Sequence, residues 1–310
     1  MTLATFLLSV VVGTWNGNWF PSGRAEHRAH PEVEAATINA AGRMLAAGLA
    51  KADPTGKEDV ILSLCEIRNR KVAEELVAAI GRKDLKVASV SAYRRRDRFD
   101  QQQNVILTTL PVAASSWARW TPVAEANPPR GYAAAKVVLE PAVTASVYSV
   151  HLKANYGATT EKIVAENRAK RTNAINEFIR LASDEDHVIL AGDFNADKWR
   201  KSFAAETIFV SLEGAGYANL LELLPPKGRG THPNKRYGDS ALDYIMTKGF
   251  DSAAMPFLEP NDQLSDHYAV FARVTPVRLE KSAPRPTRSA RRPDASAPSS
   301  VEILSPLTCR

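Results

Sequence analysis

The chain of 310 residues can hold one large domain or two small ones, and its 45% hydrophobic and 24% charged residues are typical of a soluble globular protein. Its net charge of +6 is weak support for a polyanionic partner, because half of that excess lies in residues 279–310. Two cysteines and the absence of paired Cys-x-x-Cys motifs argue against a disulfide framework and a structural zinc site.

The N-terminal run from Thr2 to Val12 is apolar enough to resemble the hydrophobic part of a signal peptide. No Lys or Arg precedes it, however, and no small-residue cleavage site follows before Trp15. Removing the run would also remove the strand that delivers Asn16. We therefore interpret it as the first core strand and expect a cytoplasmic protein, with secretion left open. No other stretch approaches the roughly 20 apolar residues of a membrane span.

Beyond this run the chain alternates short β-rich segments with helical ones. Runs rich in Val, Ile and Leu predict strands, and apolar residues at helical spacing predict helices. In chain order these are a helix at Pro31–Ala52, a strand at Val60–Cys65, a helix at Lys71–Ile80, strands at Leu85–Ala92, Asn104–Thr109, Ala133–Leu139 and Ala145–Leu152, a helix at Thr160–Ala182, and strands at His187–Ala191, Ala241–Met246 and Tyr268–Val274.

The helix predicted at Thr160–Ala182 has the clearest signals. Thr159 or Thr160 can cap its first turn, and Glu161 suits the positive end of its dipole. Asn167 and Arg171 interrupt its apolar face, so that face is imperfect.

Strands mixed with helices, without a break in composition, predict one layered α/β domain over residues 1–278. After Val277 the composition changes to Ser, Pro, Ala and Arg. Such a segment cannot bury a core, so we expect residues 279–310 to form a disordered tail. Its arginines could bind an acidic surface, but a solvated end is the simpler interpretation.

Polar residues follow the apolar runs at the points where buried strands should meet solvent. In a layered α/β fold, strand ends are where sites are assembled, so these side chains are expected to share one end of the molecule. They are Asn16, Glu66, His151, Asp193, Asn195, Asp243, Asp266 and His267.

Each of these residues also has an ordinary structural explanation. Glu66 could pair with a nearby arginine, Asp193 and Asn195 could form an Asx-turn, and His151 could be a satisfied core histidine. Asp243 is harder to explain in this way, since an acid inside an apolar strand needs a partner. Taken together, the residues favour a functional site.

The same residues suit hydrolysis of a phosphate ester, which needs an oriented water, a base and positive charge on the phosphoryl group. Hard oxygen ligands such as Glu66 suit Mg²⁺ or Mn²⁺. Histidines paired with acids can stay protonated and donate to phosphate oxygens. The amides of Asn16 and Asn195 can orient phosphate or water without adding negative charge.

Six segments carry these residues in a recognisable order. TWNGNWF, LCEIRN, SVHLKA, AGDFNAD, ALDYIM and SDHYAV resemble the signature blocks of the endonuclease/exonuclease/phosphatase family, which includes pancreatic deoxyribonuclease, abasic-site endonucleases, sphingomyelinases and inositol-polyphosphate 5-phosphatases. Each block is weakly specific alone, but six in order are strongly specific. The resemblance runs from about Val11 to Val274, and it implies a four-layer sandwich of two mixed sheets with helices outside.

The resemblance also implies roles. It assigns the principal Mg²⁺ to Glu66, with help from Asn16. It assigns orientation of the attacking water and the phosphate to the GDxN block, and contact with the scissile phosphate to the last histidine, paired with an acid. Asp266 would belong to a metal site or its surroundings. In this sequence the GDxN residues are Asp193 and Asn195, and the last histidine is His267, with Asp243 as its paired acid.

His151 distinguishes branches of the family. It resembles the second histidine of the deoxyribonuclease and sphingomyelinase branches, whereas abasic-site endonucleases carry tyrosine in that block. In the deoxyribonuclease branch an acid pairs with this histidine. Asp97 and Asp100 are candidates here, although both could simply balance the neighbouring arginines.

Three functions are compatible with these motifs. The first is a metal-dependent nuclease-like phosphodiesterase on DNA or RNA, working as a monomer. The second is a hydrolase of small or lipid phosphoesters, and the third is a non-catalytic scaffold. The first is preferred because basic residues on inferred loops could track a phosphate backbone. Arg94, Arg96, Lys235 and Arg236 are the predicted substrate contacts, with Arg95, Arg98, Lys198, Arg200 and Lys201 as further candidates.

Overall fold

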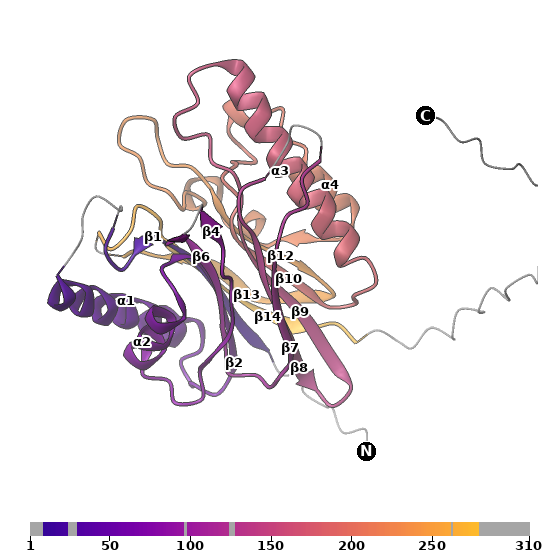
Figure 1. The fold of residues 1–310 in the computed structure, drawn as a ribbon. Helices are drawn as coiled ribbons and strands as arrows, with labels where there is room; N and C mark the ends of the chain where they lie inside the picture. Colours follow the sequence, from indigo (N-terminus) through magenta and orange to yellow (C-terminus); the bar gives the residue numbers. More distant parts are fainter. Residues whose placement is uncertain (1–8, 24–29, 96–97, 124–127, 262, 279–310) are drawn as a thin grey trace, which may run out of the picture. The chain divides into compact units, whose positions relative to one another are not determined.

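Two six-stranded sheets form the centre of the protein (Figure 1). The computed structural model describes residues 9–23, 30–95, 98–123, 128–261 and 263–278. The first sheet has the strand order β13 (Phe250–Glu259), β14 (Ala269–Pro276), β1 (Val10–Phe20), β2 (Asp59–Ile67), β6 (Gln103–Thr108) and β3 (Lys86–Val90). The second has the order β11 (Ala218–Asn219), β12 (Asp243–Lys248), β10 (Val188–Asp193), β9 (Val143–His151), β8 (Gly131–Glu140) and β7 (Val112–Arg119). A separate ribbon pairs β4 (Arg94–Arg95) with β5 (Arg98–Phe99).

Both sheets are mixed. In the first, β1 pairs parallel with β2 and antiparallel with β14. In the second, β10 pairs parallel with β9 and antiparallel with β12. The two parallel pairs bring the carboxyl ends of β1, β2, β9 and β10 to sheet edges from which polar side chains can converge.

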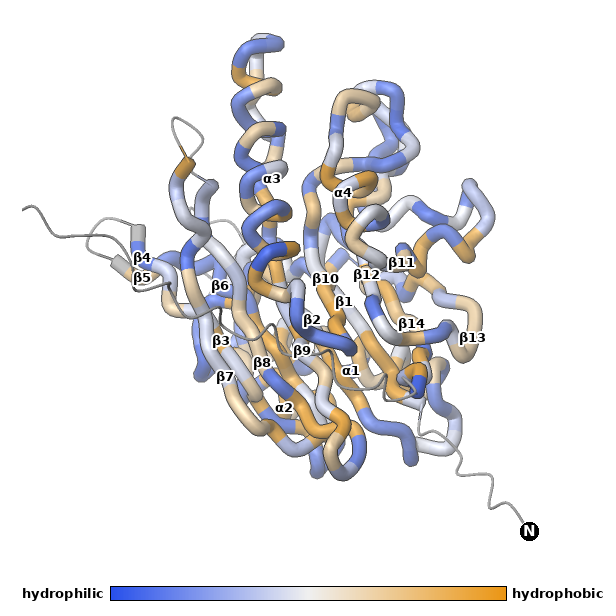
Figure 2. The backbone as a smooth tube through the Cα atoms, turned by 90° about the vertical axis from the view of Figure 1, so that its right-hand side faces the viewer, coloured by the Kyte–Doolittle hydropathy of each residue, from blue (hydrophilic) through white to orange (hydrophobic). Residues whose placement is uncertain are grey.

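Alternation along β1 shows how the strands hold two cores. Val10 and Val12 pack with the second sheet, whereas Val11 and Trp15 pack with the helices on the other side. Successive side chains of a strand point to opposite faces, so a strand that is apolar throughout must be covered on both. Figure 2 shows the hydrophobic segments concentrated in these central strands.

Helices cover the outer faces. α1 (Pro31–Ala52) and α2 (Arg70–Ile80) pack on the first sheet, and α3 (Glu161–Leu181) and α4 (Ile208–Gly214) pack on the second (Figure 1). Gly48 allows α1 to approach the sheet closely, because a Cβ there would lie 2.2 Å from the Phe271 ring. Helix, sheet, sheet and helix together confirm the predicted four-layer α/β sandwich.

The predicted helices and strands are found with boundary shifts of a few residues. Besides the two-residue strands and the short 3-10 helices, β7, β13 and α4 were not predicted. β7 and β13 are edge strands with mostly exposed side chains, so they lack the apolar runs that identified the other strands. α4 spans only 7 residues, too few to show a helical repeat.

The polar interruption of α3 has a structural explanation. Thr160 is the N-cap, and its side chain accepts a hydrogen bond from the Ile163 amide. Arg171 is fully buried, pairs with Glu206 and donates to the Lys153 carbonyl over 2.6 Å. The buried charge is thus matched by an acid from another segment, which spacing alone cannot reveal.

Both chain ends extend beyond the described residues. The strand predicted at Thr2–Val12 is confirmed from Val10 onward, since residues 1–8 lie outside the described ranges. Residues 279–310 also lie outside them, so the disordered tail stays a prediction. Among the helices of the described ranges, none has the length and apolar character needed to cross a membrane.

Candidate active site

Three predicted site residues lie side by side across the second sheet. Asp193, the last residue of β10, is in register with His151 on β9 and with Asp243 on β12. All three side chains are at least nine-tenths buried. Pairing of the three strands therefore brings two acids and an imidazole from distant parts of the sequence into one row.

The first sheet contributes Asn16 and Glu66 to the same place. The sequence predicted both at strand ends, but β1 continues to Phe20 and β2 to Ile67. That part of the prediction was wrong because the strands keep pairing past an irregularity between Asn16 and Phe20. The irregularity is what turns these polar side chains toward the site instead of into the core.

Left-handed backbone marks both sides of the site. Glu66 has φ 60° and Asn195 has φ 50°, a region that non-glycine residues occupy at a cost. The residue before Asp193 must be glycine, since a Cβ on Gly192 would lie 1.9 Å from the Val150 carbonyl oxygen. The GDxN motif thus allows the close contact between β10 and β9 at its glycine, and its left-handed asparagine forms the turn that presents Asp193 and Asn195.

Asn16 links the two sheets through the acids. Its Nδ2 donates to Glu66 Oε1 over 3.2 Å and to Asp193 Oδ2 over 2.9 Å. Asn195 donates to the Asp193 carboxylate from its backbone amide and its side chain, both over 2.8 Å. Glu66 Oε2 in turn accepts from the Trp19 amide over 3.0 Å. These bonds fix two carboxylates in a site closed to most solvent.

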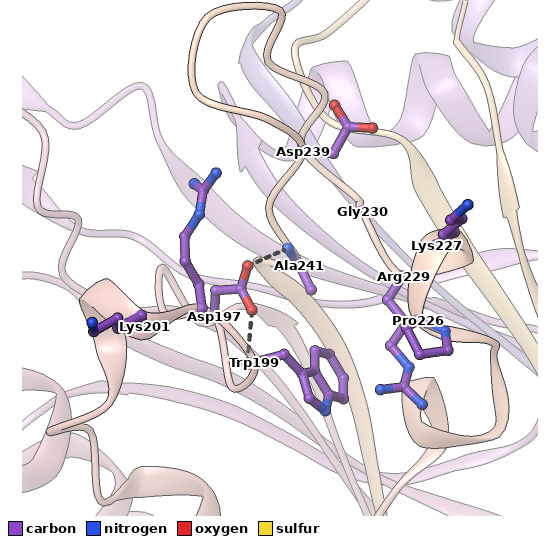
Figure 3. A pocket seen from close by; sticks show the side chains of 10 residues that line it. Asp197, Trp199, Lys201, Pro226, Lys227, Arg229, Gly230, Asp239 and Ala241 are labelled. Atoms are coloured by element: carbon purple, nitrogen blue, oxygen red, sulfur yellow. Dashed lines mark hydrogen bonds between the residues drawn. The ribbon is translucent and has the colours of Figure 1, made fainter.

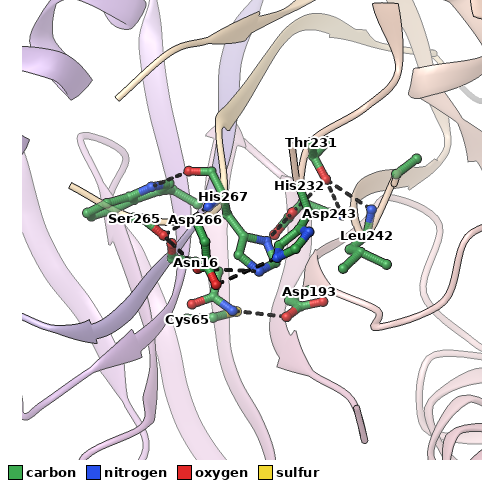
Figure 4. Close-up of polar contacts among 12 residues, drawn as sticks. Asn16, Cys65, Asp193, Thr231, His232, Leu242, Asp243, Ser265, Asp266 and His267 are labelled. Atoms are coloured by element: carbon green, nitrogen blue, oxygen red, sulfur yellow. Dashed lines mark hydrogen bonds and ion pairs between the residues drawn. The ribbon is translucent and has the colours of Figure 1, made fainter. Parts of the chain in front are cut away.

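His267 completes the cluster from the loop before β14 (Figure 4). Its Nδ1 lies 2.7 Å from Asp243 Oδ2, which also accepts from the Thr231 hydroxyl over 2.7 Å. The His267 carbonyl accepts from the Trp15 indole over 3.2 Å. Ligand atoms of Asp193, Asp243 and His267 lie within 4.8 Å of one another. The structure thus unites residues from six separated segments.

A match to a known protein family agrees with this geometry. Residues 13–267 match the model of the endonuclease/exonuclease/phosphatase family. The chain belongs to this family. The predicted resemblance is therefore confirmed, and the family's common reaction class, hydrolysis of phosphoesters, is supported for this chain. No curated protein sequence matches it.

Solved structures share the fold at low sequence identity. An endonuclease/exonuclease/phosphatase protein from Beutenbergia cavernae is 16% identical with a TM-score of 0.59, and the match covers 87% of this chain and 72% of that one. D. rerio TDP2 in complex with a single-strand DNA product is 14% identical with a TM-score of 0.55, covering 86% and 99%. Sphingomyelinase C from Streptomyces griseocarneus is 17% identical with a TM-score of 0.54, also covering 86% and 99%.

The buried environment shifts the pKa values of two site residues, Asp193 and His267. Burial raises the pKa of Asp193 to about 7. Burial lowers the pKa of His267, but the charge and hydrogen bond of Asp243 outweigh that effect and raise it to about 10. At neutral pH His267 is therefore a cation facing a carboxylate that is near its titration point.

His151 differs from His267. Burial lowers the pKa of His151 well below its ordinary value, and the charge of Arg130 adds to this. Its Nε2 lies 3.5 Å from Asp193 Oδ2, whereas its buried Nδ1 has no hydrogen-bond partner within the described ranges. A histidine paired with an acid can stay protonated, and this holds for His267. For His151, burial and the neighbouring positive charges outweigh the carboxylates near its Nε2.

The acids beside His151 are Asp193 and Glu66, whose carboxylate oxygens lie 3.5 and 3.7 Å from its Nε2, and not the candidate Asp100. Asp100 instead accepts a hydrogen bond from the Gln102 amide over 3.0 Å in a turn, and Asp97 lies outside the described residues. Gln102 itself donates to Glu66 Oε2 and accepts from Arg130. The sequence analysis missed this Gln102–Arg130 link, since neither residue follows an apolar run.

The residues fit a divalent cation. Three buried carboxylates, those of Glu66, Asp193 and Asp243, share the site with one cationic imidazole, that of His267, and burying excess negative charge is costly. Carboxylate and amide oxygens are the ligands that hard divalent ions prefer. Dependence on a divalent metal is general in the family.

The predicted substrate contacts lie on the surface. Arg94 on β4 is exposed, with its guanidinium 4.9 Å from the Phe99 ring centroid, and Arg96 lies outside the described residues. Lys235 and Arg236 are exposed on the loop between Thr231 and Asp243. A further candidate, Lys198, instead pairs with Glu213 and Glu222, so its charge is already matched.

The raised pKa values predict how stability varies with pH. His267 binds a proton more tightly in the folded protein than its ordinary value of 6.5 allows, so its stabilisation is lost as pH rises toward 10. The free energy of unfolding of the metal-free protein should fall by at most about 1.4 kcal/mol per pH unit for this one proton. Asp243→Asn should lessen the fall.

Urea unfolding in EDTA, carried out on both proteins from about pH 7 to about pH 10, measures this difference. Burial raises the pKa of the core tyrosines above this range in the folded protein, and tyrosines of the unfolded chain titrate alike in both proteins, so comparing the two slopes cancels their contribution. An equal fall in wild type and Asp243→Asn would contradict the assignment of the proton to His267.

Proposed function

We propose that the chain is a divalent-metal-dependent phosphodiesterase that cleaves nucleic acid. The observation that carries this proposal is the cluster in which Asn16 joins Glu66 to Asp193 while His267 is held by Asp243. All of these groups come from one chain, so a monomer suffices. The cluster combines an anchored metal-binding acid, an acid near its titration point and a cationic imidazole.

Glu66 and Asn16 would hold Mg²⁺ or Mn²⁺, with Asp266 as a further acid at the mouth of the site. When bound, the ion supplies positive charge to the phosphate and lowers the pKa of water. A metal held by carboxylate and amide oxygens keeps open positions for water and substrate.

The chain's own residues supply the other requirements of hydrolysis. Asp193 orients the attacking water and takes its proton, for which a pKa of about 7 is suited. The water oxygen bonds to phosphorus as the bond to the leaving oxygen breaks. Asn195 holds Asp193 in place, and protonated His267 donates a hydrogen bond to a phosphate oxygen. Neutral His151 donates or accepts beside Asp193 without adding charge.

A basic groove next to the site favours nucleic acid as the substrate (Figure 3). It has a volume of about 680 Å³ and lies along segments that flank the site: Asp197 follows Asn195 by two residues, and Ala241 precedes Asp243 by two. Asp197 accepts from the Trp199 and Ala241 amides, which ties these segments together. We call this the Trp199 groove, and its charged and aromatic lining is Asp197, Trp199, Arg200, Lys201, Lys227, Arg229 and Asp239, with four basic residues against two acidic ones.

The groove combines cations with a flat stacked surface. The Arg229 guanidinium lies 4.4 Å from the centroid of the Trp199 ring, and its Nε donates to the Leu224 carbonyl over 2.8 Å. Trp199 is 38% exposed. Positive grooves with aromatic and arginine planes bind single-stranded nucleic acid, because every base offers a face for stacking. Arg94, Arg96, Lys235 and Arg236 are proposed to contact phosphates further along the strand.

A substrate comparison tests the proposal. The purified protein with Mg²⁺ or Mn²⁺ should cleave single-stranded DNA or RNA and bis-p-nitrophenyl phosphate, and EDTA should stop both reactions. Parallel assays use sphingomyelin and phosphoinositides. Turnover of a lipid with DNA and RNA untouched would refute the nucleic-acid substrate, and no turnover of any ester with several metals would refute the enzyme.

Trp199→Ala is predicted to weaken the binding of single-stranded oligonucleotides but not that of a small phosphodiester. Loss of one stacking plane should raise their KM about 10-fold, while kcat/KM for bis-p-nitrophenyl phosphate stays the same because that ester does not reach the groove. Steady-state kinetics with both substrates measure the effect. Trp117→Ala is the matched control, since Trp117 is also exposed but lies on β7. An equal change in both variants would show that the Trp199 groove does not bind the oligonucleotide.

A further inference from the structure

A third histidine, which the sequence analysis did not identify, lies at the mouth of the site. His232 Nε2 is 3.6 Å from Asp266 Oδ2, and His267 Nε2 is 3.9 Å from Asp266 Oδ1. The centroids of the His232 and His267 rings lie 4.9 Å apart, and the ring planes make an angle of 70° (Figure 4). Ligand atoms from the three residues all lie within 4.8 Å of one another. Two imidazole nitrogens and one carboxylate are thus gathered in one small region at the mouth of the site.

The backbone holds these side chains in place. His232 exchanges both backbone hydrogen bonds with Ser240, over 2.8 and 3.0 Å. The carbonyl of Thr231, the preceding residue, accepts from the Tyr268 amide over 2.7 Å, which ties this loop to the segment of His267. Ligands on such anchored segments need only small side-chain movements to close on an ion, and the Asp266 side chain, 48% exposed, is free to make them.

The arrangement around His267 resembles that of a metal-binding histidine. Such a histidine donates its second ring nitrogen to a carboxylate, which fixes the ring and strengthens the ligand. His267 does this with Nδ1 toward Asp243, leaving Nε2 for Asp266 and His232. The His232 side chain is 24% exposed, so the cluster opens to solvent on one side. Open positions there admit water or a phosphate oxygen.

We propose that His232, Asp266 and His267 form a second metal site that takes a borderline transition ion such as Zn²⁺. Two histidines and one carboxylate with open positions are a known ligand set of zinc hydrolases, and imidazole suits such ions far better than it suits Mg²⁺. The site is separate from the oxygen ligands of Glu66 and Asn16. An ion bound there would replace the proton on His267 Nε2 and would supply the positive charge that the imidazolium otherwise offers to the phosphate.

Cobalt titration tests the proposal, because Co²⁺ replaces Zn²⁺ and absorbs visible light strongly in low-coordinate nitrogen sites. Wild-type protein saturated with Mg²⁺ should develop this absorption. His232→Ala should bind Co²⁺ about 100-fold more weakly or worse, and Asp266→Asn should weaken it too. Glu66→Gln should keep the absorption. Equal thermal unfolding of the variants and wild type shows that each is folded, and His232→Gln replaces His232→Ala if that variant does not fold.

Two results would overturn the site. Absorption that persists in His232→Ala places the ion on the neighbouring Asp193, Asp243 and His267 cluster, and absorption that disappears in Glu66→Gln places it on the oxygen site. The readout is metal binding, so a failure to hydrolyse any phosphoester leaves it unaffected. The second site and the proposed activity can therefore fail independently.

Discussion

His267→Ala is expected to lower kcat for phosphodiester hydrolysis about 1,000-fold, with a much smaller change in KM. The imidazolium, kept charged by Asp243 and buried in the cluster, strengthens its hydrogen bond as charge builds on the phosphoryl oxygens. Loss of one such donor typically costs two to three orders of magnitude, and loss of a general acid costs about as much.

Steady-state rates on bis-p-nitrophenyl phosphate and on an oligonucleotide measure this effect. His30→Ala is the matched control, because His30 is exposed ahead of α1 and its side chain makes no capping bond. Asp243→Asn should give an intermediate loss, since it keeps the ring but lowers the pKa of His267. A His267→Ala enzyme within about tenfold of wild type would remove His267 from the reaction.

Glu66→Gln is expected to weaken Mn²⁺ binding about 100-fold and to lower kcat by a similar factor. The substitution removes the negative charge and places an NH₂ group where the carboxylate accepts hydrogen bonds. Glu66 accepts from Asn16, Trp19 and Gln102, and a glutamine cannot accept from all of them. Both the ion's ligand and the geometry that holds it are affected.

Electron paramagnetic resonance of free Mn²⁺ gives the affinity, and rates measured at increasing Mg²⁺ show whether excess metal restores activity. Glu75→Gln is the control, because Glu75 lies on α2 in an exposed pair with Lys71. If Glu66→Gln binds Mn²⁺ as tightly as wild type, the principal ion is held elsewhere in the acidic cluster.

The sequence supported the site where polar residues followed buried strands. Asp193, Asp243 and His151 were recognisable because an apolar run cannot end in a charge or imidazole without a reason. The positions of Asn16 and Glu66 within their strands were not, because a pairing irregularity leaves no mark in hydrophobic periodicity.

Gln102, Arg130 and His232 were missed for a related reason. They lie on loops, where neither periodicity nor a turn motif distinguishes a residue that points into a site from one that points into solvent. Their partners are distant in sequence: Gln102 donates to Glu66 on β2, and His232 pairs with Asp266 on the loop before β14. Only the pairing of both sheets brings such residues together.

By itself, the sequence determined the family through its six motif blocks, and that resemblance implied the four layers. The order of strands and helices follows from local causes, namely period-two burial and helical spacing. The tertiary structure decided the protonation of the histidines. His267 and His151 are both buried imidazoles beside carboxylates, yet the pKa of His267 is raised and that of His151 is lowered. The difference is the position of Asp243 and Arg130, which long-range strand pairing sets and burial amplifies.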